Sequence, residues 1–299
     1  MTSFSSISDI PDQSGRTAIL TGSNSGIGRA AAAALAAKGA HVVLAVRNLD
    51  KGRAASAAMS GSIEARELDL ADLGSIRRFA STWEGEIDLL INNAGIMAPP
   101  LSRTADGFEL QFGTNHLGHF ALTNLLIEHV TGRVVTLSSN AHRMGTIDFD
   151  DLNWEHRRYR ASRAYGQSKL ANLLFTAELQ RRLSTAGSAV LATAAHPGYA
   201  ATNLQFHSGS RLLDAVGAVC NRAIAMDADD GARPTLYAAL ADVPGGAYAG
   251  PRGVGQWRGA PKLVKRAAAA QATDVAARLW EVSERLTGVS WPLAAAVAA

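Results

Sequence analysis

Near its N-terminus the chain reads Thr21-Gly22-Ser23-Asn24-Ser25-Gly26-Ile27-Gly28, between an apolar run at residues 17–20 and an alanine-rich stretch at residues 29–38. Glycines let the backbone turn tightly and approach a ligand closely, and the first N–H groups of a following helix can bind negative charge. A glycine turn between a first strand and a first helix is typical of a site for the pyrophosphate of a dinucleotide. A purely structural tight turn is the alternative.

Outward from this turn, short apolar runs alternate with helical stretches. The pattern predicts an α/β fold, a single-domain Rossmann-type doubly wound parallel sheet of about seven strands with helices on both faces. The strands are almost continuously apolar, which indicates burial on both faces. Strands are expected at residues 17–20, 41–46, 63–70, 87–92, 133–138 and 190–196, and helices at 27–38, 75–83, 106–130, 161–183 and 274–287.

Composition limits the class of protein. Hydrophobic residues make up 47% of 299 residues and charged residues 18%, which is typical of a globular domain with a sizeable core. The net charge is only +3, and the sequence contains no run of basic residues, so we expect no nucleic-acid partner. The single cysteine, Cys220, cannot form an internal disulfide and suits a reducing compartment. No signal peptide or membrane-spanning run is evident, so we expect a cytoplasmic protein without a membrane anchor.

We expect one domain over residues 15–290, with flexible tails at residues 1–14 and 291–299. Residues 141–160 and 199–226 interrupt the alternation, and such insertions lie where ligands bind, at the carboxyl ends of strands. Residues 199–226 are apolar without a period and are predicted to form a substrate loop or lid. Ordinary packing under a loop is the alternative. The apolar residues of this loop are Tyr199, Phe206, Leu212, Leu213, Val216, Val219 and Met226.

The spacing Gly-x-x-x-Gly-x-Gly, together with Asn92-Asn93-Ala94-Gly95 after the fourth strand, resembles the short-chain dehydrogenase/reductase family. The resemblance extends over nearly the whole chain. It implies a nicotinamide dinucleotide held by the glycine turn and by the Asn93-Ala94-Gly95 segment. It also implies that Asn93 lies by the adenosine ribose, Asp69 and Leu70 near the adenine, and Pro197-Gly198 near the nicotinamide carboxamide.

One residue bears on the choice of dinucleotide. Arg47 follows the second strand, at the position where an enzyme that prefers NAD carries an acid for the ribose 2′-hydroxyl. A guanidinium there can make two charge-assisted hydrogen bonds to a 2′-phosphate, so we predict NADP(H) as the cofactor. A solvated arginine at a strand end is the alternative.

The pair Tyr165 and Lys169 carries the predicted chemistry. Four residues apart on one expected helix, the two side chains share a face and can reach one site. A free phenol has a pKa of about 10, and a neighbouring ammonium with an oxidised nicotinamide favours the phenolate. We therefore expect Tyr165 to exchange a proton with a substrate oxygen near neutral pH. Taken alone, such a spacing is common on solvated helix faces.

Ser138 and Ser139 end the fifth strand at its carboxyl edge, where a hydroxyl can hold a substrate carbonyl oxygen. The family resemblance implies that Ser139 is catalytic and that Ser138 is its structural neighbour. It also implies that Asn115 kinks its helix and holds a water in a proton relay with Lys169. His116 and His119 lie three residues apart, but no carboxylate or cysteine stands in register with them, so we predict no metal site.

Within the family, residues 45–48, 115–120, 138–142, 167–175 and 196–199 look like the retinol-dehydrogenase-like branch, which also includes protochlorophyllide reductases. This implies an oxidoreductase that interconverts a carbonyl and an alcohol on an apolar substrate, and a possible homodimer or homotetramer through the two long helices. We expect no apolar N-terminal anchor of the kind that membrane retinol dehydrogenases carry, which argues against a retinoid substrate. Light-dependent C=C reduction of a tetrapyrrole and a non-catalytic NADP-sensing regulatory protein are the alternatives.

Overall fold

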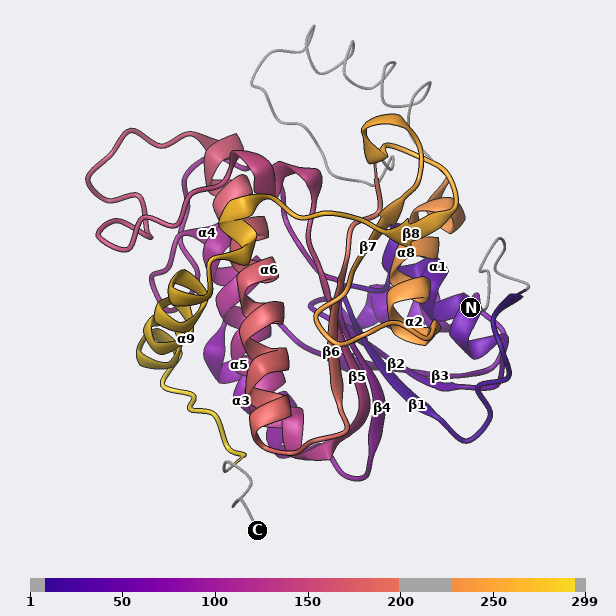
Figure 1. The fold of residues 1–299 in the computed structure, drawn as a ribbon. Coiled ribbons are helices and arrows are strands. Elements are labelled where there is room, and N and C mark those ends of the chain that lie inside the picture. The colour runs from indigo at the N-terminus through magenta and orange to yellow at the C-terminus, as the bar shows by residue number, and fades with distance from the viewer. Residues whose placement is uncertain (1–8, 199–226, 294–299) are drawn as a thin grey trace, which may run out of the picture.

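The computed structural model describes residues 9–198 and 227–293. Within them, eight strands form one sheet in the order β3-β2-β1-β4-β5-β6-β7-β8 (Figure 1). Strands β1 to β7 pair in parallel, and β8 pairs antiparallel with β7. The order reverses between β1 and β4, as in a doubly wound fold. The strands are β1 (Thr17–Thr21), β2 (His41–Val46), β3 (Ser62–Glu67), β4 (Ile87–Asn92), β5 (Val130–Leu137), β6 (Leu191–Ala195), β7 (Tyr248–Pro251) and β8 (Pro261–Leu263).

Helices cover both faces of the sheet, which confirms the predicted fold class (Figure 1). Along β1, Ala18 and Leu20 face the core that includes α1 and α8, while Ile19 faces the core formed with α3, α5, α6 and α9. This alternation follows from the two-residue period of a strand. The helices are α1 (Gly26–Ala36), α2 (Leu49–Ala57), α3 (Leu73–Ser81), α4 (Leu110–Phe112), α5 (Gly118–Leu126), α6 (Ala161–Thr185), α8 (Ala228–Leu240) and α9 (Thr273–Thr287).

Several local predictions were wrong. The described sheet has eight strands where about seven were predicted, and β7 and β8 were missed because they contain proline and are too short to show a strand pattern. Strand β3 lies at the sheet edge and is only partly buried, so its two faces are not both covered. Helices α2 and α8 were missed because α2 contains Gly52 and α8 contains Pro234. The helix predicted over residues 106–130 is divided into α4, the π-helix Gly113–Leu117, α5 and a 3₁₀ turn.

The packed domain extends beyond the predicted limits of 15 and 290. Ile10 is 2% exposed, and the Gln13 N–H donates to the Lys38 carbonyl at 2.7 Å. At the other end, the Trp291 ring lies 5.6 Å from the Trp280 ring. Residues 1–8, 199–226 and 294–299, which include the predicted substrate loop, lie outside the described residues.

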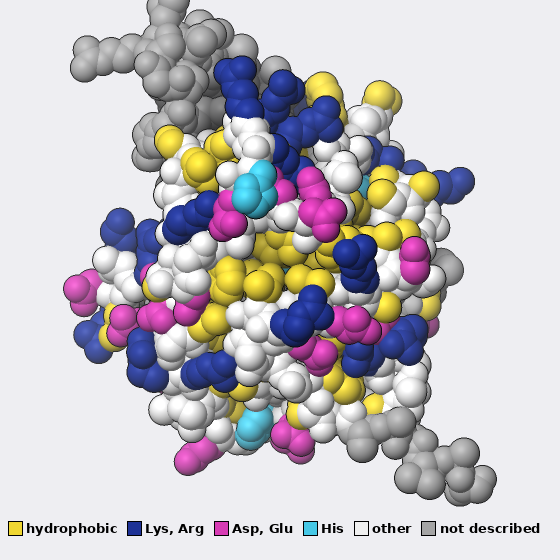
Figure 2. All heavy atoms as spheres, turned by 90° about the vertical axis from the view of Figure 1, so that its left-hand side faces the viewer, with side chains coloured by type: hydrophobic (Ala, Val, Ile, Leu, Met, Phe, Trp, Pro, Cys, Tyr) yellow, Lys and Arg dark blue, Asp and Glu magenta, His cyan; other side chains and the backbone are white. Residues whose placement is uncertain are grey.

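Helix α9 packs across α5 and α6. The Trp280 ring meets Phe120 edge-on at 4.9 Å and stacks on Phe175 at 5.7 Å, while the Arg182 guanidinium lies 4.5 Å from its centroid. Figure 2 shows the left-hand side of Figure 1, where hydrophobic side chains gather in the middle of a charged border. Helices α5 and α6, which are predicted to pair between subunits, are therefore partly covered by α9 of the same chain.

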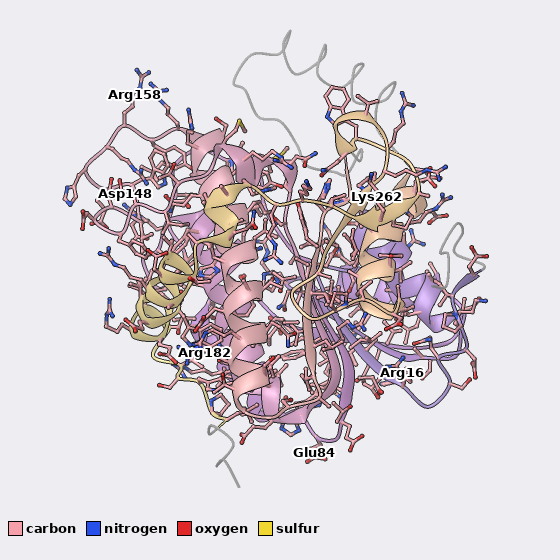
Figure 3. All side chains as sticks on the ribbon, viewed as in Figure 1. Arg16, Glu84, Asp148, Arg158, Arg182 and Lys262 are labelled. Carbon is pink, nitrogen blue, oxygen red and sulfur yellow. The ribbon has the colours of Figure 1, made fainter. Side chains whose placement is uncertain are left out.

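Charged side chains lie on several sides of the fold. Figure 3 marks Asp148 and Arg158 on the segment before α6, Lys262 on β8, and Glu84 near the opposite end of the sheet. Positive and negative side chains are thus distributed over the surface together, in keeping with the small net charge. Across residues 9–198 and 227–293, every helix is too short or too polar to cross a membrane.

Candidate active site

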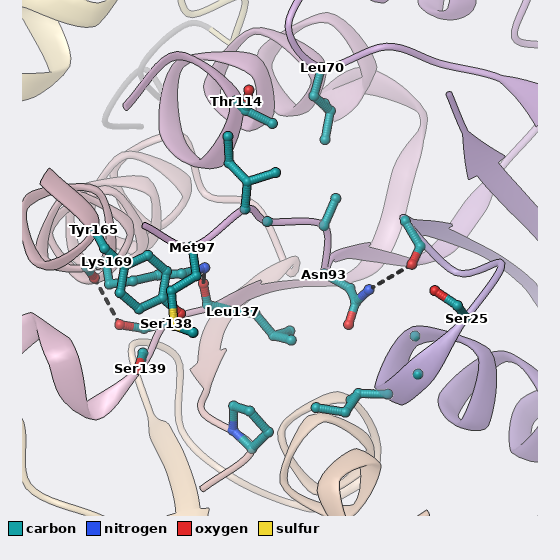
Figure 4. A pocket seen from close by; sticks show the side chains of 18 of the residues that line it. Ser25, Leu70, Asn93, Met97, Thr114, Leu137, Ser138, Ser139, Tyr165 and Lys169 are labelled. Carbon is teal, nitrogen blue, oxygen red and sulfur yellow. Dashed lines mark hydrogen bonds between the residues drawn. The ribbon is translucent and has the colours of Figure 1, made fainter. Parts of the chain in front are cut away.

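A cavity of about 630 Å³ opens at the carboxyl ends of the central strands, beside the reversal of strand order between β1 and β4 (Figure 4). In doubly wound folds this is where ligands bind. The cavity brings together most of the residues predicted from sequence. Its predicted lining residues are Gly22, Asn24, Ser25, Gly26, Ile27, Gly28, Arg47, Asp69, Leu70, Asn93, Ala94, Gly95, Ser139, Tyr165, Lys169, Pro197 and Gly198.

The glycine turn has the conformation and the space that glycine alone allows. Gly22 and Gly26 have φ angles of 61° and 54°, in the left-handed region that side chains disfavour. A Cβ added to Gly28 would lie 2.4 Å from the Asn93 Nδ2 atom and 2.8 Å from the Gly22 carbonyl oxygen. Gly28 therefore permits close packing of α1 against the neighbouring turn.

Helix α1 begins without a side-chain cap. Ser25 is its N-cap residue but makes no capping hydrogen bond, and the first turn carries no acidic residue. By contrast, Asn48 accepts from the Lys51 N–H at 2.8 Å at the start of α2, and Asp72 accepts from the Gly74 N–H at 2.7 Å at the start of α3. The bare amides and positive dipole end of α1 border the cavity, an arrangement that fits a pyrophosphate.

The cationic side chains lie at the same end of the cavity. Arg47 is exposed and lines the cavity, and it forms no ion pair within the part of the chain that the structure describes. Arg29 and Lys51 line an adjoining hollow that also touches Asn24 and Ser25. Three positive charges therefore lie near the end of β2, and Arg47 has no ion-pair partner among the described residues, although the Asp69 carboxylate also borders the cavity.

Two predicted cofactor residues have local partners. The Ser23 hydroxyl donates to the Leu20 carbonyl at 2.8 Å, and Ser23 does not line the cavity. The Ser23 hydroxyl therefore closes the turn from behind, and a contact of Ser23 with the cofactor stays a prediction. The Asp69 carboxylate accepts from the Ala71 N–H at 2.9 Å and still borders the cavity, as does buried Leu70.

Tyr165 and Lys169 project from α6 into one end of the cavity, with Ser139 at the end of β5 (Figure 4). Lys169 is 4% exposed, its Nζ atom donates to the Leu137 carbonyl at 3.1 Å, and Nζ lies 5.7 Å from the Tyr165 ring centroid. The Ser138 hydroxyl donates to the Lys169 carbonyl at 2.8 Å. Ser138 thus anchors α6 to β5, while Ser139 is left toward the cavity.

Burial shifts both titratable groups toward their neutral forms. It raises the pKa of Tyr165 to about 12, against a hydrogen bond with Ser139, and lowers the pKa of Lys169 to about 8. In the protein without a dinucleotide, the loss of solvent dominates the pKa of Tyr165. The contribution expected from an oxidised nicotinamide stays a prediction.

Asn115 lies behind the cavity wall in the π-helix Gly113–Leu117 and does not line the cavity. Its Oδ1 atom accepts from the Ile96 N–H at 2.8 Å, and its Nδ2 atom donates to the Ile96 carbonyl at 3.0 Å and to the Ser168 hydroxyl at 2.9 Å. A Cβ added to Gly95 would lie 3.2 Å from Lys169 Nζ and 3.3 Å from Asn115 Oδ1. Gly95 therefore separates the two side chains.

Two further histidines hold backbone atoms of the site. His142 Nδ1 donates to the Ser139 carbonyl at 2.6 Å. His196 Nδ1 accepts from the Gly198 N–H at 3.2 Å, and its Nε2 atom lies 2.9 Å from Gln256 Oε1. Both rings are buried. The sequence does not show which backbone atoms they contact, so this supporting role was not predicted. In the described part of the chain, no group of three or more His, Cys, Asp or Glu side chains is placed to hold a metal.

Some residues of the cavity wall were not predicted. Some of them directly follow the predicted Asn93-Ala94-Gly95 segment, and others lie in or next to the insertion at residues 141–160. The additional residues toward the Tyr165 end are Ile96, Met97, Ala98, Thr114, Ala141, Met144 and Ser162.

Proteins of known family are similar to this chain. A family model described as short chain dehydrogenase matches residues 16–211. Retinol dehydrogenase 13 of Homo sapiens is 44% identical over 299 residues, which cover 93% of this chain and 86% of that protein. Retinol dehydrogenase 12 of Mus musculus is 40% identical over 289 residues, covering 93% and 88%.

Solved structures are also similar to this chain. A crystal structure of an uncharacterised protein from Mycobacterium paratuberculosis is 51% identical, with a TM-score of 0.85, and covers 96% of this chain and 99% of that one. A structure from Beutenbergia cavernae, described as an NAD(P)-dependent gluconate 5-dehydrogenase with bound NADP, is 28% identical with a TM-score of 0.56 and covers 77% and 91%.

Proposed function

The chain belongs to the short-chain dehydrogenase family, in its retinol-dehydrogenase-like branch, and on this premise we propose that it is an NADP(H)-dependent oxidoreductase interconverting a carbonyl and an alcohol on an apolar substrate. One observation carries the proposal. The bare start of α1 and the group of Ser139, Tyr165 and Lys169 border the same cavity. A cofactor held at one end and a proton donor at the other are the parts that this reaction requires.

In the reducing direction, the Ser139 hydroxyl donates a hydrogen bond to the substrate carbonyl oxygen and polarises it. The Tyr165 phenol transfers its proton to that oxygen as the alcohol forms, and takes a proton back in oxidation. Lys169, as the ammonium, stabilises the phenolate left on Tyr165. The dinucleotide, when bound, supplies the hydride to the carbonyl carbon or accepts it from the alcohol.

The preference for NADP(H) is supported by charge. Arg47 borders the cavity without an acidic partner in the described chain, and Arg29 and Lys51 lie beside it. A 2′-phosphate adds negative charge at this end, and a guanidinium can bind it through two N–H groups. The structure described as having NADP bound belongs to a relative with a similar fold.

The substrate class is supported by the cavity wall near Tyr165, where Met97, Ala98, Ala141 and Met144 present apolar surface and Ser162 a hydroxyl. Thioether side chains adapt to varied apolar shapes. The names of the relatives add retinoids to the candidates. A dimer or tetramer stays a prediction, and one formed through α5 and α6 has to accommodate α9, which already packs there.

A substrate screen tests the proposal. Purified protein is mixed with NADPH and with aliphatic, aromatic, steroid or retinoid carbonyls, and the loss of NADPH absorbance is followed. We expect turnover of at least one apolar class, with slower rates when NADH replaces NADPH. Binding of NADPH without turnover of any carbonyl supports the sensing alternative instead, and turnover that needs light and a tetrapyrrole supports the C=C reductase.

A further inference from the structure

His119 lies between the two ends of the active site and belongs to neither set of predicted residues. It is in the first turn of α5 and is 1% exposed. Its Nε2 atom lies 2.9 Å from the Thr21 hydroxyl, at the end of β1, and its Nδ1 atom lies 2.9 Å from the Asn115 carbonyl. One buried ring thus contacts the cofactor-side turn and the helix that carries Asn115.

The hydrogen bonds of Thr21 determine which ring nitrogen carries the proton. The Thr21 hydroxyl accepts from the Asn93 N–H at 3.0 Å and from the Ala94 N–H at 2.9 Å. A hydroxyl has two acceptor positions and one hydrogen. With both acceptor positions filled, Thr21 must donate its hydrogen to His119 Nε2. His119 Nδ1 therefore bears the ring proton and donates it to the Asn115 carbonyl.

The resulting chain of donors runs in one direction. The amides of Asn93 and Ala94 donate to Thr21, Thr21 donates to His119, and His119 donates to Asn115. Asn93 and Ala94 border the cavity at its dinucleotide end. The Asn115 side chain, in turn, holds Ile96 and Ser168, and Ser168 lies one turn from Tyr165.

We propose that His119 is a positioning residue that sets the cofactor-binding turn and the Asn115 segment of the proposed enzyme at a fixed relative position. The inference rests on the proposed function, because the two segments matter together only when a cofactor and a substrate react between them. A neutral histidine suits this place because one ring nitrogen can accept a hydrogen bond from Thr21 while the other donates one to the Asn115 carbonyl. Burial keeps the ring neutral and lowers the pKa of His119 to about 4.

Two variants separate the two bonds. In His119→Asn, the amide occupies the place of Nδ1 and retains a donor for Asn115, while Thr21 loses its acceptor. In His119→Gln, the amide oxygen reaches the place of Nε2 and retains the acceptor for Thr21, while Asn115 loses its donor. Leaving one buried group without its partner corresponds to a change of about 5-fold to 100-fold in an equilibrium or rate.

The experiment measures the NADPH Kd by fluorescence titration, kcat with a carbonyl that the wild-type protein reduces, and the thermal midpoint. We expect His119→Asn to raise the NADPH Kd about tenfold with kcat within about twofold of wild type. We expect His119→Gln to lower kcat about tenfold with the Kd within about twofold. His116→Gln is the matched control, because His116 lies one turn away and bonds to Ser283 of α9 instead.

The readouts distinguish the possible failures. If the wild-type protein reduces no carbonyl, the proposed function fails, whatever the variants do. If it does so and both variants shift Kd and kcat equally, or lower only the thermal midpoint as His116→Gln does, His119 is a structural residue and the inference is overturned. Should His119→Asn not fold, Thr21→Val removes the same bond from its other end, together with the acceptor of the Asn93 and Ala94 N–H groups, and an unchanged NADPH Kd in that variant also overturns the inference.

Discussion

The start of α1 borders the cavity and Asn115 lies behind its wall, and the two places are built in opposite ways. Ser25 leaves the first amides of α1 without a side-chain cap, whereas the polar atoms of the Asn115 amide have protein partners at 2.8–3.0 Å. A missing cap costs about 0.5–2 kcal/mol of stability. At this cavity, the amides proposed to bind a ligand are left open, while the groups that orient the reacting residues are closed by the protein itself.

The largest expected effect concerns the reacting end. Tyr165→Phe removes the hydroxyl that gives and takes the proton, so we expect kcat to fall about 10²–10⁴-fold. Because the variant leaves the α1 turn unchanged, NADPH should bind as in the wild-type protein. Absorbance assays and fluorescence titration on the same preparation measure the two quantities.

Tyr159→Phe is the matched control for this change. Its hydroxyl bonds to buried Glu109 at 3.0 Å outside the cavity lining. We expect it to lower stability by about 1 kcal/mol with little effect on kcat. Full activity in Tyr165→Phe would exclude Tyr165 as the proton donor.

The next effect concerns the open end. Ser25→Asp places a carboxylate at the N-cap of α1, where it can accept from the bare amides and compete with a pyrophosphate. We expect the free energy of unfolding to rise by about 0.5–2 kcal/mol and the NADPH affinity to fall about 100-fold through loss of charge-assisted hydrogen bonds. Urea denaturation and fluorescence titration measure the two changes.

Ala272→Asp is the corresponding control, because α9 also begins without a side-chain cap and lies away from the cavity. It should stabilise the fold by a similar amount and leave NADPH binding unchanged. If Ser25→Asp were stabilised without any loss of affinity, the start of α1 would not be the pyrophosphate site.

A smaller effect distinguishes the two dinucleotides. Arg47→Gln removes the guanidinium at the end of β2, so we expect KM for NADPH to rise about tenfold while KM for NADH stays nearly constant. Arg53→Gln is the control, since Arg53 is an exposed arginine on α2 outside the cavity lining. Equal changes for both dinucleotides in Arg47→Gln would contradict a role in binding the 2′-phosphate.

The sequence was most informative where the signal is local. The glycine turn occupies eight consecutive residues, and Tyr165 and Lys169 are four apart on one helix, so spacing alone brought each set together. The bond between Thr21 and His119 joins residues 98 apart, and no local pattern reports such a contact. The helix break at Asn115 was implied by the family resemblance, whereas the bond from Asn115 to Ile96, on a different segment, was not. Likewise, the pattern does not show on which side of its turn the Ser23 hydroxyl points.

The smallest expected effect is the acid sensitivity of the closed region. Burial lowers the pKa of His116 to about 3 and of His119 to about 4, from an ordinary value of 6.5. Below about pH 6.5 the unfolded chain binds protons that the folded protein does not, so stability is present above this pH and is lost as the pH falls toward 4. Each histidine should contribute a loss of about 1 kcal/mol per pH unit, measured by urea denaturation between about pH 6.5 and about pH 5. His119→Gln should have the shallower dependence, and an unchanged slope would mean that His119 is already protonated in the folded protein.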